Sequence, residues 1–569
     1  MPWYHNSSRR EFIIRAGALP AALAGSAVLS ACGGGDDPIP AFDFGVASGD
    51  PLADRVILWN HARFPGTDAP VDLIWEVATD ASFGQIVANG NTQASASRGF
   101  TAKVDAAGLQ PGKDYFYRFR YGSYSSPVGR TRTLPASGAQ EVRLAVFSCS
   151  NYPAGFFHAY AEAARSQAQY AVHLGDYIYE YGANGYATAD ATRLGRVSQP
   201  ATECLTLQDY RQRYAQYRSD PDAKALHAAM PMIAIWDDHE TANDAYRDGA
   251  QNHTEGAEGR WVDRRAAAVQ AWHEWMPVRT PNLNDLLQIY RSFDFGGLMA
   301  LHMLETRLLA RDKQIAFAEL LNPATAASAQ AALISPNRTM LGASQWGWLQ
   351  QRLAESRATW QVLGQQVLMA RMTFPVSILR YLNPDNITPE GLAAAQKAIS
   401  DYLTAKAIAA QNPAALTDEQ KALLDPQRNP KLGYNLDAWD GYPAEREKIL
   451  ATARQLGKRL VVLAGDTHNA WASELTLQDG TRVGYEFATP GVSSPGLEEY
   501  LAALPPQQIR QIFLGVVDDL RYADTARRGF MLVTFTPSEA RAQWFLLDTV
   551  KQRQYTVDST AVMRYAPPA

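Results

Sequence analysis

Leu460-Val-Val-Leu-Ala-Gly-Asp-Thr-His468 is an apolar run that ends in a glycine, a carboxylate and an imidazole. Three other stretches share this design: Arg143-Leu-Ala-Val-Phe-Ser-Cys149, Tyr170-Ala-Val-His-Leu-Gly-Asp176 and Met232-Ile-Ala-Ile-Trp-Asp-Asp-His239. Short apolar runs of this length are typical of buried strands. We therefore expect four strands, each with its polar residues at the carboxyl end.

In α/β folds, ligand chemistry gathers outside the carboxyl ends of strands. The four predicted strands would bring a thiol, several carboxylates and two histidines to one edge. Thiolate, imidazole and carboxylate together suit a borderline or transition metal, and an oxygen-rich side suits harder cations. The pattern predicts a site for several metal ions, of the kind that hydrolases use.

The chain has 569 residues, which is too long for one ordinary core, so two or more domains are expected. Residues 41–135 read as an all-β sandwich, with short strands such as Arg55–Trp59, Val71–Val77 and Asp114–Arg120 between turns. Residues 140–569 alternate apolar strands with Ala-rich helical stretches, which indicates a layered α+β domain.

Two features in the second half of the sequence refine this outline. Gly529–Pro537 and Ala540–Leu546 alternate in polarity and are predicted to be strands that complete a second sheet. Residues 383–430 are predicted to form a helical insertion, which Thr388 would cap and Pro389 would begin. The insertion is either a surface elaboration or a lid or membrane-facing element.

The amino-terminal sequence resembles a twin-arginine export signal over residues 1–32, because Arg9-Arg10 precede a short apolar run from Ala16 to Ala31. Leu29-Ser-Ala-Cys32 resembles a lipobox, which would make Cys32 a lipidated anchor in the cell envelope. The alternative is cleavage near Ala31, which would leave a soluble periplasmic protein. Residues 33–40 form a flexible tether.

The net charge of −5 and the lack of a long basic run argue against a nucleic-acid partner. The chain has three cysteines, Cys32, Cys149 and Cys204. Cys149 and Cys204 could form a disulfide in an oxidising compartment. The position of Cys149 at a strand end favours a metal thiolate instead, with Cys204 as a structural thiol.

The candidate site residues differ in what they can do. Asp176 follows a glycine that lets the backbone turn sharply, and its two oxygens can bridge two cations. Tyr179 is either a core aromatic residue or a phenolate ligand, which would suit ferric iron. His468 is a candidate ligand, and His239 is a candidate proton donor or phosphate contact.

The run from Asp237 to Glu240 places three acids around a histidine, which is costly in a dry core without counter-ions. It is either a cation site or a solvated loop. Asn243 and Asp244 follow closely and could add oxygen ligands for a hard ion.

The order of these motifs resembles the alkaline phosphatase D (PhoD-like) branch of the metallophosphoesterases. The resemblance rests on Cys149-Ser150, Gly175-Asp176-x-x-Tyr179, Trp236-Asp-Asp-His239-Glu240 and Gly465-Asp466-Thr-His468. It covers nearly the whole mature chain.

Phe44-Gly-Val-Ala-Ser-Gly-Asp-Pro51, Glu305-Thr-Arg307 and Trp439-Asp-Gly-Tyr-Pro443 support this resemblance. Two departures stand out. Glu305 replaces the aspartate that relatives usually have, and the helical insertion looks longer than usual.

The resemblance implies a four-layer α/β-β/α metallophosphatase domain behind an immunoglobulin- or fibronectin-like sandwich. It implies Fe³⁺ with Ca²⁺, or Zn²⁺ or Mn²⁺ instead, in a site related to that of purple acid phosphatases. Around the iron it places Cys149, Asp176, Tyr179 and either His468 or Asp466. Asp176 would bridge to the calcium side, where Asp238 and the other member of the Asp466/His468 pair belong.

The implied reaction is hydrolysis of phosphate mono- or diesters, for phosphate acquisition, by hydroxide formed on the metal. His239 would contact or protonate the substrate, and Arg307 could clamp the phosphoryl group. The alternatives are a phospholipase D-type phosphodiesterase that acts on phospholipids and a lipoprotein that binds metal or phosphate without turnover.

The export signal generates the first prediction. Arg9→Lys combined with Arg10→Lys should block export, because the twin-arginine machinery reads the paired guanidinium groups. Cys32→Ser should release the protein from the membrane fraction and leave catalysis intact. Cell fractionation with an activity assay measures both effects, and membrane retention of Cys32→Ser would contradict the lipobox.

Overall fold

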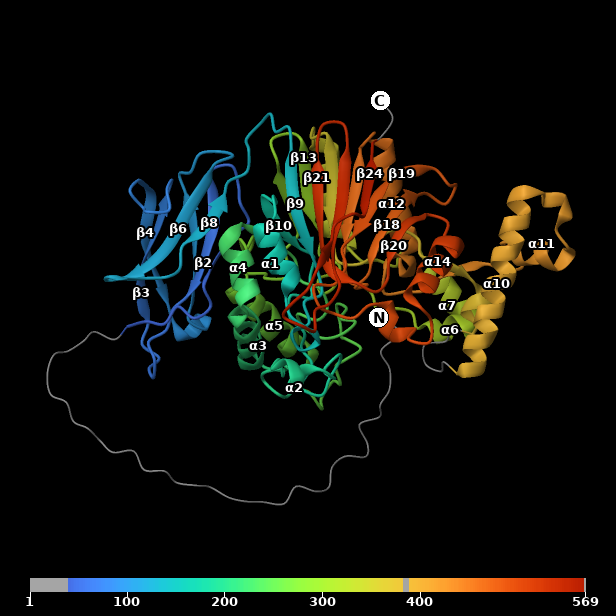
Figure 1. Cartoon of the computed structure of the whole chain (residues 1–569), viewed down its shortest axis with the longest axis horizontal. Coiled ribbons are helices and arrows are strands. Elements are labelled where there is room, and N and C mark those ends of the chain that lie inside the picture. Colours follow the sequence, from blue (N-terminus) through green and yellow to red (C-terminus); the bar gives the residue numbers. More distant parts are fainter. Residues whose placement is uncertain (1–38, 382–387, 567–569) are drawn as a thin grey trace, which may run out of the picture.

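Two large sheets carry the mixed α+β fold of the computed structural model, which describes residues 39–381 and 388–566 (Figure 1). The predicted α+β class is confirmed. The predicted signal segment and most of the tether lie outside the described residues. Among the described residues, no helix is long and apolar enough to span a membrane.

The first sheet has ten strands in the order β23-β22-β21-β9-β10-β11-β1-β2-β5, with β24 paired to β22. Its strands are β1 (Val46–Gly49), β2 (Arg55–His61), β5 (Thr101–Ala107), β9 (Val142–Phe147), β10 (Tyr170–His173), β11 (Met232–Ala234), β21 (Arg528–Phe535), β22 (Ala540–Leu547), β23 (Val557–Asp558) and β24 (Val562–Tyr565). The neighbours β9, β10 and β11 run parallel, so their carboxyl ends meet at one edge.

The second sheet has seven strands in the order β12-β13-β14-β17-β19-β18-β20. They are β12 (Arg291–Asp294), β13 (Met299–Met303), β14 (Trp360–Gly364), β17 (Leu460–Ala464), β18 (Ala470–Thr476), β19 (Arg482–Ala488) and β20 (Leu520–Asp524). A five-stranded sheet contains β3 (Val71–Ala78), β4 (Ile86–Ala94), β6 (Asp114–Tyr121), β7 (Tyr124–Ser125) and β8 (Gly129–Arg132). β15 (Thr373–Pro375) and β16 (Lys431–Gly433) form a short pair.

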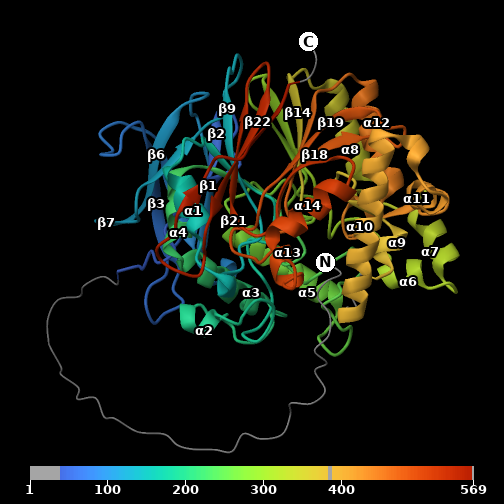
Figure 2. The same cartoon turned by 45° about the vertical axis from the view of Figure 1, so that its right-hand side comes forward.

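The helices are α1 (His158–Arg165), α2 (Ala191–Leu194), α3 (Leu207–Ser219), α4 (Pro221–Ala229), α5 (Trp261–Trp275), α6 (Phe317–Leu321), α7 (Ala326–Leu333), α8 (Gly342–Glu355), α9 (Val376–Leu379), α10 (Pro389–Gln411), α11 (Asp418–Leu424), α12 (Pro443–Gln455), α13 (Leu497–Tyr500) and α14 (Pro506–Val516). The helical insertion supplies α10 and α11, which project on the side opposite the amino-terminal strands (Figures 1 and 2). Thr388 caps α10 as predicted, accepting a hydrogen bond from the Gly391 amide at 3.0 Å.

Strand β17 shows how the layers pack, because all of its residues are buried. Val461 and Leu463 belong to the apolar core that also contains Val146 of β9. Leu460 and Val462 point the other way, into the core formed with α8 and α12. One face of the second sheet therefore packs against the first sheet and the other face against helices.

The two strands predicted near the end of the chain are present, but the sheet assignment was wrong. β21 pairs with β9, and β22 pairs with β21, so both complete the first sheet. Local polarity gives strand character, but the partner is chosen by tertiary contacts that alternation does not encode.

The amino-terminal strands are divided between two sheets. β1, β2 and β5 extend the first sheet, because Gly49 of β1 pairs with Met232 of β11. Their other face packs against the five-stranded sheet around Val56, Leu58 and Phe119. A Cβ atom at Gly49 would lie 2.2 Å from a backbone oxygen, so only glycine fits this junction.

Asp50 locks the same junction and generates the second prediction. Its fully buried carboxylate accepts two hydrogen bonds from Arg291, both at 2.8 Å, and one from the Arg279 amide at 2.7 Å. Asp50→Ala would leave the Arg291 guanidinium without its partner and should lower the free energy of unfolding by ~3–5 kcal/mol. Urea unfolding measures this change.

The control is Asp54→Ala, because Asp54 pairs with Arg55 on the surface, where both side chains are substantially exposed. Exposed pairs contribute little to stability. Similar losses in the two variants would show that the Asp50 contacts do not hold the junction.

Candidate active site

The carboxyl ends of β9, β10, β11 and β17 converge on one buried cluster of ligand-type side chains. It consists of three overlapping groups, in each of which the ligand atoms lie within 4.8 Å of one another: Cys149, Asp176 and His468; Asp176, Asp238 and His239; Asp237, Asp238 and Asp466. Because Asp176 and Asp238 are shared, the groups form one continuous site. Three of the strands come from the first sheet and one from the second.

The backbone turns sharply where the chain leaves these strands. Cys149, Asp176, Asp466 and His468 all have φ between 54° and 63°, a left-handed conformation that costs roughly 1–2 kcal/mol per residue for side chains other than glycine. Gly175 precedes Asp176 at φ 110°, where a Cβ atom would meet the Asp237 Cβ at 2.3 Å. Strain of this kind persists where the surroundings fix it, which is typical of functional sites.

Tyr179 and His468 meet on the thiol side of the cluster. The Tyr179 hydroxyl lies 2.9 Å from Asp176 Oδ2 and 3.2 Å from His468 Nε2, and it accepts a hydrogen bond from Ser494 at 2.7 Å. His468 Nδ1 lies 2.7 Å from the Pro495 carbonyl oxygen. Burial lowers the pKa of His468 to about 3, so the imidazole is neutral and its Nε2 lone pair faces the cluster.

Four carboxylate oxygens in the cluster are buried and have no hydrogen-bond partner: Asp176 Oδ1, Asp237 Oδ2, Asp238 Oδ1 and Asp466 Oδ2. Buried polar atoms are nearly always satisfied, so orphans at one place require an explanation. Burial raises the pKa of Asp176 and Asp466 well above the usual range and that of Asp237 to about 7. Cations would satisfy the oxygens and stabilise the ionised carboxylates, so this donor set fits metal ions.

Arg307 lies at the carboxylate end of the cluster and is fully buried. Its guanidinium donates to Asp237, to Asp437 at 2.7 Å and to Asp466 at 3.2 Å, and it lies 3.7 Å from Asp238. Asp437 was not predicted as a site residue. It is held in turn by Arg311 at 2.5 Å, a tertiary contact that no local pattern signals.

His239 stands beside Tyr179, with ring centroids 4.2 Å apart. Its Nδ1 lies 2.7 Å from Glu180 Oε2, so the imidazole is oriented by a buried carboxylate. Asn243 lies next to this pair. Its backbone amide donates to Glu180 at 2.9 Å, and its side-chain Nδ2 donates to Gln251 at 2.9 Å. The structure thus places His239 and Asn243, which were both predicted, around Glu180, which was not predicted as a site residue.

Two other glutamates hold the ligand loops by accepting from backbone amides. Glu240 accepts from Asp176 at 2.9 Å and from Asp237 at 2.7 Å, and so ties the loops after β10 and β11 together. Glu305 accepts from Trp236 Nε1 at 2.8 Å and from the amides of residues 307 to 309. Glu305 therefore fixes the loop that carries Arg307.

Cys149 and Cys204 are both free and buried. No disulfide links them, and Cys149 lies within the ligand cluster, as the metal-thiolate interpretation requires. Cys204 lies elsewhere in the core, where burial raises the pKa of its thiol to about 12.

The chain matches the model of the PhoD-like phosphatase family over residues 144–544 and that of the PhoD-like phosphatase amino-terminal domain over residues 31–135. It is 35% identical over 544 residues to alkaline phosphatase D of Bacillus subtilis, covering 92% of this chain and 80% of that protein. A solved structure of PhoD superposes with a TM-score of 0.74 at 32% identity, covering 94% of this chain and 92% of the other.

The fold, the cluster and these similarities define a phosphoester hydrolase. The chain belongs to the PhoD-like phosphatase family.

The two cysteines generate the third prediction. Cys149→Ser should lower the bound metal content, because it replaces a thiol ligand with a poorer donor. Cys204→Ser, outside the cluster, should leave the metal content unchanged. Metal analysis of the purified variants measures the difference, and equal metal content in both would contradict a ligand role for Cys149.

Proposed function

We propose that this protein hydrolyses phosphate mono- and diesters at the cluster centred on Asp176. The observation that carries the proposal is the set of four buried, unpartnered carboxylate oxygens beside a thiol and a neutral imidazole. Such a donor set suits a transition metal on one side and a harder cation on the other. Phosphate acquisition is the role that we propose for the reaction.

We assign Fe³⁺ to Cys149, Asp176, Tyr179 and His468, because the phenol contacts both the carboxylate and the imidazole. The oxygen-rich side, with Asp176, Asp238 and Asp466, would hold Ca²⁺. Asn243 is the proposed further oxygen ligand, and its backbone amide contacts Glu180 beside His239. Zn²⁺ or Mn²⁺ is the alternative that metal analysis would reveal. When bound, the cations would activate water and neutralise charge on the phosphoryl group.

His239 is the proposed contact to the substrate. Glu180 engages Nδ1, so Nε2 is the atom left to contact a phosphoryl oxygen or to protonate the leaving group. Glu180 is then a positioning residue that fixes the ring.

The contacts of Arg307 favour a role in positioning the carboxylates over the role of phosphate clamp that was expected from the sequence. Asp237, Asp437 and Asp466 already occupy its donors, and the side chain has no exposed surface. We propose that it fixes the spacing of the carboxylates and offsets part of their repulsion.

We also propose where the protein is located and how its domains are built. Arg9-Arg10 support export by the twin-arginine route, and Cys32 supports a lipid anchor, with a periplasmic protein as the alternative. The position of the second sheet between the first sheet and α8 and α12 supports a four-layer catalytic domain over 140–569. The packed sheets of residues 41–135 support an immunoglobulin-like region.

The fourth prediction compares two buried aspartates. Asp176→Asn should abolish hydrolysis of p-nitrophenyl phosphate and bis-p-nitrophenyl phosphate, because Asp176 is the proposed bridging ligand. Asp437→Asn should lower the rate only ~10–100-fold, the usual effect of a group behind the ligands, because both Asp437 oxygens already pair with arginines.

Steady-state rates on both substrates, with metal analysis, test this comparison and also separate monoester from diester preference. Equal losses in the two variants would argue against the bridge. Absence of turnover on both esters by the metal-loaded wild type would refute the proposed function.

A further inference from the structure

Two tyrosines pack against the imidazoles of the catalytic cluster and continue the site towards the surface. The Tyr181 ring lies beside the His239 ring, with centroids 5.3 Å apart. The Tyr186 ring stacks on the His468 ring, with centroids 6.3 Å apart and planes 18° apart. Both histidines are buried, whereas both tyrosines are only half-buried. The tyrosines therefore present aromatic surface at the outer side of the imidazoles.

A tight turn brings the two tyrosine rings together. The Gly185 amide donates to the Gly182 carbonyl oxygen at 3.0 Å, and the ring centroids of Tyr181 and Tyr186 lie 6.2 Å apart. A Cβ atom at Gly185 would lie 2.5 Å from the Tyr181 Cβ, so only glycine lets the turn close. Ala187 follows at φ 55°, a strained conformation that persists where the surroundings fix it.

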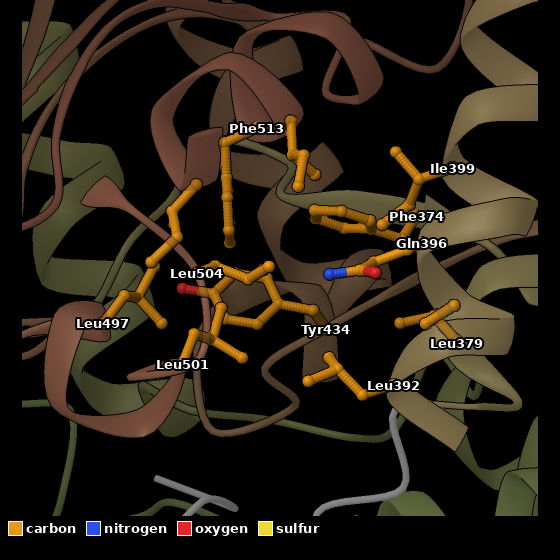
Figure 3. A pocket seen from close by; sticks show the side chains of 13 residues that line it. Phe374, Leu379, Leu392, Gln396, Ile399, Tyr434, Leu497, Leu501, Leu504 and Phe513 are labelled. Atoms are coloured by element: carbon orange, nitrogen blue, oxygen red, sulfur yellow. The ribbon is translucent and has the colours of Figure 1, made fainter. Parts of the chain in front are cut away.

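The Tyr186 ring is also held from the side of the carboxyl-terminal helices. Its hydroxyl accepts a hydrogen bond from Tyr500 at 2.9 Å and donates to the Pro495 carbonyl oxygen at 3.4 Å. Tyr500 ends α13, and Leu497 of this helix and Leu501 just after it line an apolar pocket (Figure 3). The packing of these leucines fixes the helix that positions the Tyr186 ring.

The contact between Tyr181 and His239 places this aromatic surface on the leaving-group side of the reaction. Glu180 engages His239 Nδ1, which leaves Nε2 as the proposed proton donor to the leaving group. A leaving group that accepts this proton must lie next to the His239 ring. The Tyr181 ring is the half-buried aromatic neighbour of that position.

We infer that Tyr181 and Tyr186 bind the leaving group and select phosphate esters whose leaving group carries a planar aromatic ring. The inference rests on the proposed function and adds a substrate class to it. Aromatic rings pair with one another in offset-stacked or edge-to-face geometry and gain more from this contact than from apolar burial alone. A saturated ring of similar size lacks that gain. The planar ring is either the aryl group of a phenol ester or the base of a nucleotide.

The test compares the binding of benzylphosphonate and cyclohexylmethylphosphonate to the metal-loaded protein. Both carry a six-membered ring, and neither can be hydrolysed, because a methylene group replaces the ester oxygen. The wild type should bind benzylphosphonate ~2–12-fold more tightly, the ratio that a typical aromatic pair supplies. Isothermal titration calorimetry measures both values of Kd.

Substitutions at the two tyrosines test whether this ratio comes from their rings. Tyr181→Leu and Tyr186→Leu should each lower the ratio, and the double variant should bring it close to one. Tyr181→Phe and Tyr186→Phe should keep it, because the rings remain. A purely structural role would weaken both phosphonates equally and leave the ratio unchanged. Tyr124→Leu is the matched control, because Tyr124 is an exposed tyrosine of β7 in the five-stranded sheet.

AMP beside ribose 5-phosphate separates the two sources of the planar ring. A lower KM for AMP that Tyr181→Leu removes would assign the rings to a nucleobase. Equal KM values, together with the benzylphosphonate preference, would assign them to an aryl ester. Either result supports the inference.

A wild-type ratio of one or below would overturn the inference, and so would equal ratios in Tyr181→Leu and Tyr124→Leu. If the double variant does not fold, the single variants and their phenylalanine counterparts decide the question. If the phosphonates bind with the expected ratio but no ester is turned over, the proposed function fails while the aromatic site stands.

Discussion

Everything at the centre of this protein depends on the repulsion among carboxylates buried around the Arg307 guanidinium. Asp237, Asp437 and Asp466 all contact Arg307, and Asp238 lies just beyond hydrogen-bond distance. Arg311 also pairs with Asp437. Two positive charges cannot balance four carboxylates, and burial of unpaired charge is expensive. The arrangement persists because rigid neighbours hold it and because cations, when bound, would supply the missing charge.

The rest of the fold supplies that rigidity. Two sheets contribute residues to the same cluster, so their packing fixes how Asp466 and His468 from the second sheet meet the residues that follow β9, β10 and β11. Glu240 joins two ligand loops through backbone amides, and left-handed turns direct the side chains inward. Where β1 pairs with β11 in the first sheet, the ion pair between Asp50 and Arg291 holds the amino-terminal strands to the same sheet.

The strands and the residues of the cluster were predictable from the sequence because each strand carries a local signal: an apolar run followed by Cys149, Asp176, Asp238 or His468. How the strands are arranged in sheets was not predictable. β17 lies in the second sheet, whereas β9, β10 and β11 lie in the first, and β21 pairs with β9. Site residues such as Asp437 and Ser494 were missed for the same reason, since they reach the cluster only through tertiary contacts.

The pairing of β21 with β9 also sets the order in which the chain can fold. Strand β9, which leads to Cys149, becomes an interior strand only when residues 528–535, nearly 400 positions later in the sequence, pair with it. Until then one edge of β9 is exposed, and an unpaired edge invites association with other chains. Contacts this distant in sequence also close slowly. The ligand cluster is therefore supported on both sides of β9 only after residues 528–535 have been synthesised.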